Sequence, residues 1–177
     1  MRMIRGWADG SLGSWFIDDD VAITKKGVAS ELVKGDLIRV LMNNGIIKNI
    51  MVNFDASKFE VCDINPTSAD SLLNPTTYGK ALGYQIGKAY SVAGSYGYIA
   101  SESKKNADGT YVYNDMSKLI NVMLPSNMAV YDVKSGEIKP ATSSDIRTYL
   151  GHGDEGASLL VIIQDYLYSY IGIIYNR

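Results

Sequence analysis

Residues 37–52 read LIRVLMNNGIIKNIMV, two runs of β-forming side chains on either side of an Asn-Asn-Gly turn. Asn and Gly accept the positive φ angles that a tight hairpin turn requires, and the flanking Leu, Ile and Val residues favour strands. This stretch therefore predicts a β-hairpin, the strongest local signal in the chain.

The residues before this hairpin continue the β pattern. Short strands are expected at 14–17 and 21–24, separated by the run Asp18-Asp19-Asp20, and Lys25-Lys26-Gly27 closes the second of them. Residues 29–36 predict a short helical turn instead, because a glycine near their end can take the left-handed conformation that terminates a helix.

The residues after the hairpin also alternate β-type runs with turn residues. A charged Asp-Gly turn is expected at 104–109, and a short helix at 143–151 with Ser or Thr near its N-cap. Many short strands and few helices indicate an all-β chain with minor short helices. The remaining strands are expected at 85–92, 96–100, 110–113, 119–124, 128–133, 159–163 and 168–175.

The composition shifts once along the chain, which suggests two modules. Residues 63–84 hold Pro66 and Pro75 amid Ser, Thr and Asn, a composition typical of a linker or long loop. We expect two small β-barrel-like or sandwich-like modules in tandem, at 1–62 and 85–177. Both halves follow a strand with a short helical turn and a closing hairpin. The first module lacks the opening strands of the second unless residues 1–13 complete it.

Composition and charge exclude several function classes. The chain has 17 Lys and Arg against 19 Asp and Glu, a formal net charge of -2 that gives no electrostatic footprint for nucleic acid. One Cys and one His are too few for an internal disulfide or a Cys/His zinc site. The N-terminus lacks the apolar run of a signal peptide, and no apolar stretch approaches the roughly 20 residues of a membrane helix. We therefore expect no nucleic-acid partner and no membrane insertion.

Two segments carry side chains with catalytic or metal-binding chemistry. His152 lies near Asp154 in a Gly-rich stretch, and an imidazole beside a carboxylate can act as a base, although a surface turn explains the same residues. Asp18-Asp19-Asp20, with Asp9 upstream, offers oxygens to Ca²⁺, but the spacing does not match an EF-hand loop, and a solvated turn is the alternative. We assign no catalytic, cofactor-binding or metal-binding residue and expect no cofactor.

Tyrosine is frequent, at 13 residues. Exposed tyrosines on a β face can stack on sugar rings or pack against a partner, whereas tyrosine is also an ordinary strand residue. Cys62, beside Val61, is interpreted as an inert small apolar residue. The tyrosines that come into question are Tyr90, Tyr96, Tyr98, Tyr111, Tyr113, Tyr166, Tyr168, Tyr170 and Tyr175.

Two groups of segments resemble a known type of module. Residues 32–40 (LVKGDLIRV), with the Asn-Gly turn and the strand after it, resemble a hairpin of the repeated β modules in large surface proteins of Gram-positive anaerobes. VYDVKSGE at 130–137, SDIR at 144–147, GDEGAS at 153–158 and the closing residues 173–175 look like the C-terminal end of such modules. These modules occur in proteins that carry S-layer homology domains. Such a domain is not visible in these residues, so the implied wall anchor would lie outside them.

The resemblance implies a non-enzymatic structural or adhesive module of a bacterial cell-surface, S-layer-associated protein. It would lie outside the cell, as a fragment of a longer precursor. It would act by self-assembly into a homo-oligomer, lattice or fibre, since open sheet edges can pair with a neighbouring chain, or by binding a cell-wall or host glycan. The alternatives are a carbohydrate-binding module with a tyrosine platform and a phage or prophage virion component.

Overall fold

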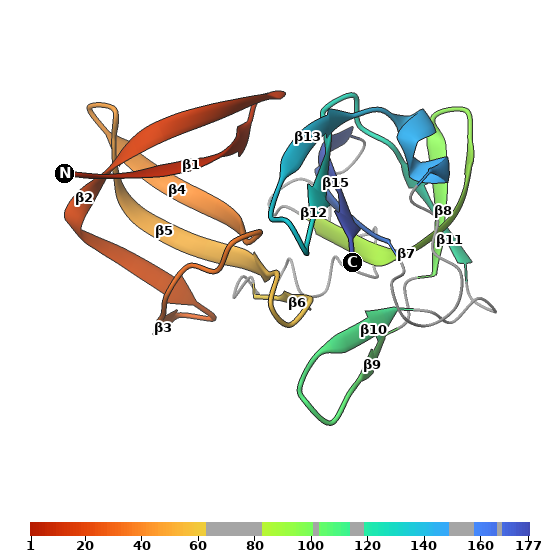
Figure 1. The fold of residues 1–177 in the computed structure, drawn as a ribbon, viewed down its shortest axis with the longest axis horizontal. Helices are drawn as coiled ribbons and strands as arrows, with labels where there is room; N and C mark the ends of the chain where they lie inside the picture. The colour runs from red at the N-terminus through yellow and green to blue at the C-terminus, as the bar shows by residue number, and fades with distance from the viewer. Residues whose placement is uncertain (63–82, 101–102, 114–118, 149–157, 166–167) are drawn as a thin grey trace. The chain divides into compact units, whose positions relative to one another are not determined.

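The computed structural model describes residues 1–62, 83–100, 103–113, 119–148, 158–165 and 168–177 (Figure 1). The chain divides into two compact units, Met1–Ile64 and Asn65–Arg177, called unit 1 and unit 2 below. The described residues are all-β apart from one short 3-10 helix, so the predicted fold class is confirmed. The expected linker 63–84 lies outside the described residues except for its last two residues, which belong to a strand.

Unit 1 is built on one sheet with the strand order β1-β2-β5-β4, in which β3 also pairs with β2 and β6 with β5. The pairing is antiparallel except between β2 and β5, which run parallel. The strands are β1 (Arg2–Ala8), β2 (Ser11–Lys25), β3 (Val28–Ala29), β4 (Leu37–Asn43), β5 (Ile46–Asp55) and β6 (Glu60–Val61).

Three tight turns connect neighbouring strands of unit 1, and each places two consecutive residues at positive φ. The pairs are Asp9-Gly10, Lys26-Gly27 and Asn44-Gly45, with φ between 49° and 81°. Two positive φ angles in a two-residue loop are typical of the type I′ turn, whose twist matches that of the strands it joins. The predicted hairpin over 37–52 is confirmed, with β4 and β5 antiparallel around Asn44-Gly45.

The helical turn expected at 29–36 is wrong. Ala29 is the second residue of β3, and the chain then closes a turn in which the Asp36 N–H donates to the Val33 carbonyl at 3.0 Å. The Asp36 carboxylate in turn accepts the Val33 N–H at 2.9 Å. A side chain that satisfies nearby backbone groups competes with the helix, and so short a segment does not repay helix nucleation.

Instead of the two strands expected at 14–17 and 21–24, unit 1 has one long strand with an irregularity. The register of β2 against β5 shifts between Ile17 and Ala22, so the aspartate run lies within β2 at the shift. In the pairing of β4 with β5, the register shifts between Leu41 and Met42, so no residue of β4 lies opposite Lys48. Such irregularities bend a strand and increase its local twist.

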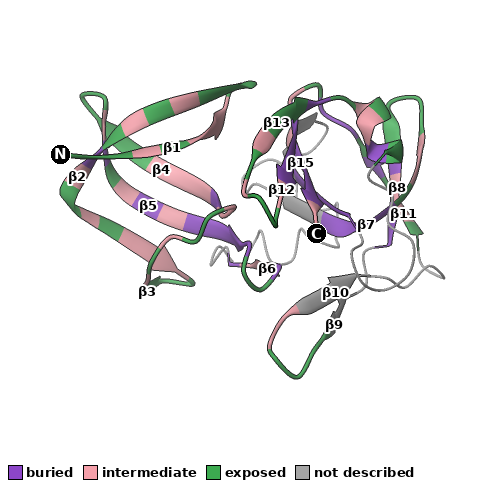
Figure 2. Cartoon of the chain, viewed as in Figure 1, coloured by how far each residue is buried: buried purple, intermediate pink, exposed green. Residues whose placement is uncertain are grey.

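One cluster of the unit 1 core is built from isoleucines. Ile17, Ile47 and Ile50 are buried, and seven partly buried apolar side chains pack around them. Trp15 is one of the seven, and its ring lies over Gly13, where an added Cβ would come within 2.6 Å of the indole. Most of the other strand residues of unit 1 are exposed or half-buried (Figure 2).

Unit 2 is built on a seven-stranded sheet with the order β11-β8-β7-β14-β15-β12-β13. A hairpin of β9 and β10 forms a separate two-stranded sheet. The strands are β7 (Gly83–Ala93), β8 (Tyr96–Ala100), β9 (Ser103–Lys105), β10 (Tyr111–Tyr113), β11 (Leu119–Met123), β12 (Met128–Asp132), β13 (Ile138–Ala141), β14 (Leu159–Asp165) and β15 (Tyr168–Asn176).

The seven-stranded sheet curves around one core. Val122 of β11 and Ala141 of β13, from the two end strands, belong to the same buried cluster as Leu160, Ile162 and Ile174 of the central strands. The predicted short helix is present as the 3-10 helix η1 (Ser143–Arg147), which adds Ile146 to this core. Strand β13 was not expected from the sequence, because Pro140 interrupts it. Proline is tolerated there since β13 is an edge strand.

The two units share a four-stranded arrangement. In unit 1 the order is β3-β2-β5-β4, and in unit 2 it is β13-β12-β15-β14. The central pair is parallel in both units and the outer pairs are antiparallel. This agrees with the repeated pattern of strand and closing hairpin in the sequence. In unit 2, β7 pairs with the outer side of β14.

Candidate functional site

The edges of the unit 1 sheet are the first candidate site. Strands β1 and β4 end the strand order of unit 1, and within the described residues no strand pairs with their outer sides. Both edges are seven residues long. Residues 1–13, which were expected to complete the first module, form β1 and the start of β2, and β1 pairs with β2; no described strand pairs with the outer side of β4.

Apolar side chains project from the same sheet. Met3 of β1 is 61% exposed and Leu41 of β4 is 63% exposed. Met3 lies opposite Phe16 of β2, which is also exposed and pairs in turn with Ile46 of β5, so these three side chains share one face. That face is the one opposite Ile17, which points into the core.

The aspartate run is used within unit 1. The Lys48 ammonium forms an ion pair with Asp18, and the Asp20 N–H donates to Asp18 Oδ1 at 3.1 Å. These two hydrogen bonds, the Lys48 bond first, hold the pKa of the Asp18 carboxyl below its ordinary value. Arg2 donates to the Asp19 carbonyl at 2.8 Å. The contacts of the aspartate run with Lys48 and Arg2 therefore stabilise the irregular part of β2.

The remaining residues considered for catalysis or metal binding are His152, Asp154 and Cys62, of which the structure describes Cys62. His152 and Asp154 lie outside the described residues. Within the described ranges, no three His, Cys, Asp or Glu side chains are grouped so that they could hold a metal ion. Cys62 is buried, and its thiol lies 3.5 Å from the Glu60 carbonyl. Burial raises the pKa of the Cys62 thiol, with the Glu60 and Asp55 charges adding to the rise.

The tyrosines fall into two groups in unit 2. Tyr131 and Tyr175 are buried, with ring centroids 5.7 Å apart in an edge-to-face contact. Tyr90 and Tyr96 are 51% and 43% exposed, and Tyr98 is half-buried. The other tyrosines considered in the sequence analysis have side chains that the structure does not describe: Tyr111, Tyr113, Tyr166, Tyr168 and Tyr170.

Tyr96 and Tyr98 lie on one face of β8, which residues of β11 share. Ile99 points into the core, so Tyr96 and Tyr98, three residues and one residue before it, point to the opposite face. Tyr98 pairs with Asn121 and Tyr96 with Met123, which lie on that same face. We call this surface the tyrosine face. Tyr90 lies at the register shift of β7, where a bulge re-aims a side chain.

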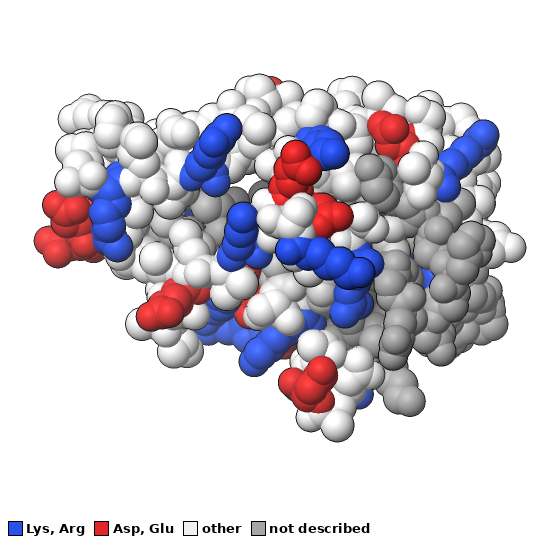
Figure 3. All heavy atoms as spheres, viewed as in Figure 1, with Lys and Arg blue, Asp and Glu red and all other residues white. Residues whose placement is uncertain are grey.

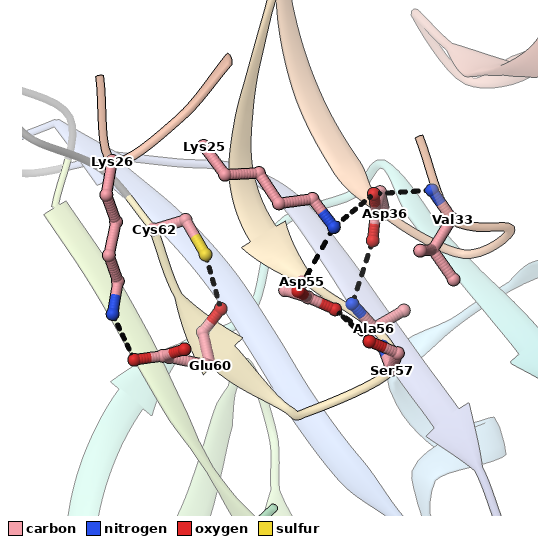
Figure 4. Close-up of polar contacts among 9 residues, drawn as sticks. All are labelled: Lys25, Lys26, Val33, Asp36, Asp55, Ala56, Ser57, Glu60 and Cys62. Carbon is pink, nitrogen blue, oxygen red and sulfur yellow. Dashed lines mark hydrogen bonds and ion pairs between the residues drawn. The ribbon is translucent and has the colours of Figure 1, made fainter. Parts of the chain in front are cut away.

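A polar cluster in unit 1 was not expected from the sequence (Figure 4). Lys25, at the end of β2, lies between Asp36 before β4 and Asp55 at the end of β5. Its Nζ is 3.0 Å from Asp55 Oδ2 and 3.4 Å from Asp36 Oδ2. The side chains of Lys25, Asp36 and Asp55 are 15%, 2% and 9% exposed. No local sequence pattern predicts this cluster, because its three residues come together only in the tertiary fold.

Backbone and hydroxyl donors fix both carboxylates of this cluster. Asp36 Oδ1 accepts the Ala56 N–H at 2.9 Å, while its Oδ2 accepts the Val33 N–H. Asp55 Oδ1 accepts both the N–H and the hydroxyl of Ser57, at 2.9 and 2.5 Å. The cluster therefore ties the ends of β2 and β5 to the turn before β4.

The three groups of the cluster titrate differently. Burial raises the pKa of the Asp36 carboxyl, and the N–H groups that bind it do not fully offset this. Burial also pushes the pKa of Asp55 upward, but hydrogen bonds from Ser57 and Lys25 outweigh it and leave that pKa below its ordinary value. Burial opposes the charge on Lys25, yet the two carboxylates outweigh burial and raise its pKa.

Charges on the surface are mixed in sign. Figure 3 shows basic and acidic side chains interspersed on the face in view. In the described parts of the chain, no helix is long and apolar enough to cross a membrane. No family model matches the chain, and neither a curated protein nor a solved structure matches it.

Proposed function

We propose that this chain is a non-enzymatic structural or adhesive module of a bacterial cell-surface protein of the S-layer-associated type, and that it assembles with further copies of itself. The single observation that carries this proposal is the outer edge of β4, with which no strand of the described residues pairs. In the matching position of unit 2, the edge of β14 is paired with β7. A strand from a second copy can fill the same place in unit 1.

The chemistry of the edge supports strand addition. An unpaired strand presents a row of N–H and C=O groups to a neighbouring chain, and main-chain hydrogen bonds then join the two chains. Charged residues and proline usually protect such edges. Strand β4 carries a single charged residue and no proline, and Leu41 and Met42 at its end are exposed.

The second edge of the same sheet supplies the partner strand. Strand β1 of one copy, paired with β4 of the next, would extend the sheet from copy to copy. An interface between two different surfaces of one molecule propagates into a filament or a ring. Strand β1 carries two arginines: Arg2 donates to the carbonyls of Asp18 and Asp19 on its own sheet, and Arg5 is exposed.

The test is to place a charge on each edge. Leu41→Lys on β4 and Met3→Lys on β1 should each reduce the assembly mass of the purified chain in light scattering and abolish ordered polymers in negative-stain micrographs. Val133→Lys is the matched control, because Val133 is an exposed apolar residue of unit 2 just beyond β12. Circular dichroism confirms that each variant folds. Assembly that survives both edge variants, or that fails equally in the control, contradicts the proposal.

A second candidate function, carbohydrate binding, is favoured by the tyrosine face. The rings of Tyr96 and Tyr98, together with the exposed amide of Asn121, combine stacking surfaces with a hydrogen-bonding group and carry no charge. Binding of soluble glycans, measured by a glycan array and calorimetry, should then weaken in Tyr96→Ala and persist in Val133→Ala. The absence of saturable glycan binding refutes this second candidate.

A further inference from the structure

Unit 1 holds a lysine and two carboxylates in the arrangement needed for a condensation reaction. We propose that Lys25 and Asp55 join in an intramolecular amide bond, an isopeptide cross-link between β2 and β5, and that Asp36 carries the proton during its formation. This proposal concerns the interior of unit 1 and does not depend on assembly through the sheet edges.

The amine and the carboxylate are already in contact. Lys25 Nζ lies 3.0 Å from Asp55 Oδ2, so the amine is next to the carboxyl carbon that it would attack (Figure 4). Groups held at this separation react as if at very high local concentration. The two residues are 30 positions apart in sequence, and the parallel pairing of β2 with β5 brings them together.

The two oxygens of Asp55 have different surroundings. Oδ1 accepts the N–H and the hydroxyl of Ser57, whereas Oδ2 faces Lys25. Two fixed donors on one oxygen stabilise the negative charge that develops there when an amine adds to the carboxyl carbon. Oδ1 is therefore the oxygen that stays in the amide, and Oδ2 is the oxygen that leaves.

Asp36 is placed to move the proton. Its Oδ2 is 3.4 Å from Lys25 Nζ, and the N–H groups of Val33 and Ala56 fix its orientation. Its side chain is only 2% exposed, and burial raises its pKa, which makes the carboxylate a better proton acceptor. A general acid–base group must lie within reach of the proton it transfers, and Asp36 meets this condition.

The surroundings restrict water and competing charges. Phe54, the residue before Asp55, is buried, and so is Phe59, with ring centroids 5.9 Å apart. Lys26, the residue after Lys25, forms its own ion pair with Glu60. Burial weakens the solvation of the ammonium and the carboxylate, but their mutual attraction and hydrogen bonds outweigh this effect, since the pKa of Lys25 is raised and that of Asp55 is lowered, so the reaction starts from the ion pair.

The reaction balances without any further reagent. The Lys25 ammonium gives a proton to Asp36, and its nitrogen attacks Asp55 Cγ and forms the N–C bond. A second proton from that nitrogen and the proton held by Asp36 pass to Oδ2, the C–O bond breaks, and water leaves. The ammonium and carboxylate become an amide and one water molecule, and Asp36 returns to its starting state.

The cross-link would stabilise unit 1. It would close the chain between β2 and β5 as a disulfide does, and so restrict the unfolded state. The matching strand ends in unit 2 carry Asp132 and Asn176, whose side chains make a hydrogen bond of 3.0 Å. That position has no amine and provides an internal comparison.

Intact-mass spectrometry of the purified, denatured chain tests the proposal. The wild-type chain should be one water molecule lighter than its sequence mass, and peptide mapping should join the peptides that contain Lys25 and Asp55. Lys25→Arg keeps the charge but cannot form this bond, so it should show the full mass. Asp36→Asn should also show the full mass while circular dichroism shows that it folds.

Lys26→Arg is the matched control, because Lys26 pairs with Glu60 outside the cluster and its variant should keep the mass deficit. A folded wild-type chain that shows its full sequence mass after prolonged incubation at neutral pH overturns the proposal. A water loss that persists in Lys25→Arg, or that maps to an Asp-Gly pair such as Asp9-Gly10, overturns it as well.

Discussion

Gly87, in the middle of β7, has no room for a side chain. A Cβ at this position would lie 2.4 Å from the Ala100 carbonyl oxygen, 2.8 Å from the Ala100 carbonyl carbon and 3.2 Å from Ile99 Cβ. Two of these atoms belong to the backbone of β8, which is fixed by its pairing with β7. Gly87→Ala therefore requires β7 and β8 to move apart, at a point where both strands line the core of unit 2.

The expected cost of Gly87→Ala follows from these contacts. Overpacking a core costs typically about 1–3 kcal/mol, and a clash with backbone belongs at the upper end of that range. Alanine regains about 0.4–1 kcal/mol by restricting the unfolded chain. We therefore expect a net loss of about 2 kcal/mol, which lowers the Tm of a domain of roughly 100 residues by about 8 °C.

Calorimetry or thermal circular dichroism measures this change in the unit 2 transition. Gly6→Ala is the control, because a Cβ there would meet only Trp15 at 3.9 Å, an ordinary contact. Its Tm should stay within about 2 °C of the wild-type value, as expected for a change within about 0.5 kcal/mol. A Gly87→Ala variant as stable as the wild type refutes the reasoning, because β8 would then have to lie farther from β7.

Three further predictions concern single residues. Gly45→Ala should lower the unfolding free energy of unit 1 by about 1–2 kcal/mol in urea titrations, since Gly45 has a φ of 76°, and an unchanged value would exclude the type I′ turn. Cys62 is buried, so a thiol reagent reaches it only when unit 1 opens locally, and an opening free energy of about 3 kcal/mol makes its reaction at least about 100-fold slower in the folded than in the unfolded chain. Equal rates in the two states would contradict its burial. The backbone N–H of Ser135 lowers the pKa of Asp132, so this carboxylate stabilises the folded state above its ordinary pKa of 3.8, and that stabilisation is lost as the pH falls through the lower folded value. Carboxyl NMR titration of Asp132 checks this, and a midpoint at or above 3.8 would refute it.

The local parts of the fold could be predicted from the sequence. The Asn44-Gly45 hairpin and the strands of unit 2 depend on neighbouring residues, because turn chemistry and β propensity are read within a few positions. The segment 29–36 was misread because Gly35, at a φ of 93°, ends a turn as readily as a helix. Pro140 concealed β13, since proline in a strand is compatible only with an edge that the sequence does not reveal.

The tertiary parts could not be predicted from single positions. The parallel pairing of β2 with β5 depends on a crossover, and it alone brings Lys25 to Asp55. The open edge of β4 likewise depends on which strands pair, and the sequence indicated only that the first module lacked opening strands. The sequence singled out nine tyrosines for either surface stacking or ordinary sheet packing, and only the structure separates the exposed Tyr90 and Tyr96 from the buried Tyr175.

The measurement that tests the central claim most directly is multi-angle light scattering of the wild-type chain over a concentration series, with negative-stain microscopy of the same samples. Assembly through the edges of β1 and β4 predicts a mass that rises with concentration and ordered polymers that disappear in Leu41→Lys. A wild-type chain that stays monomeric at every concentration contradicts the account.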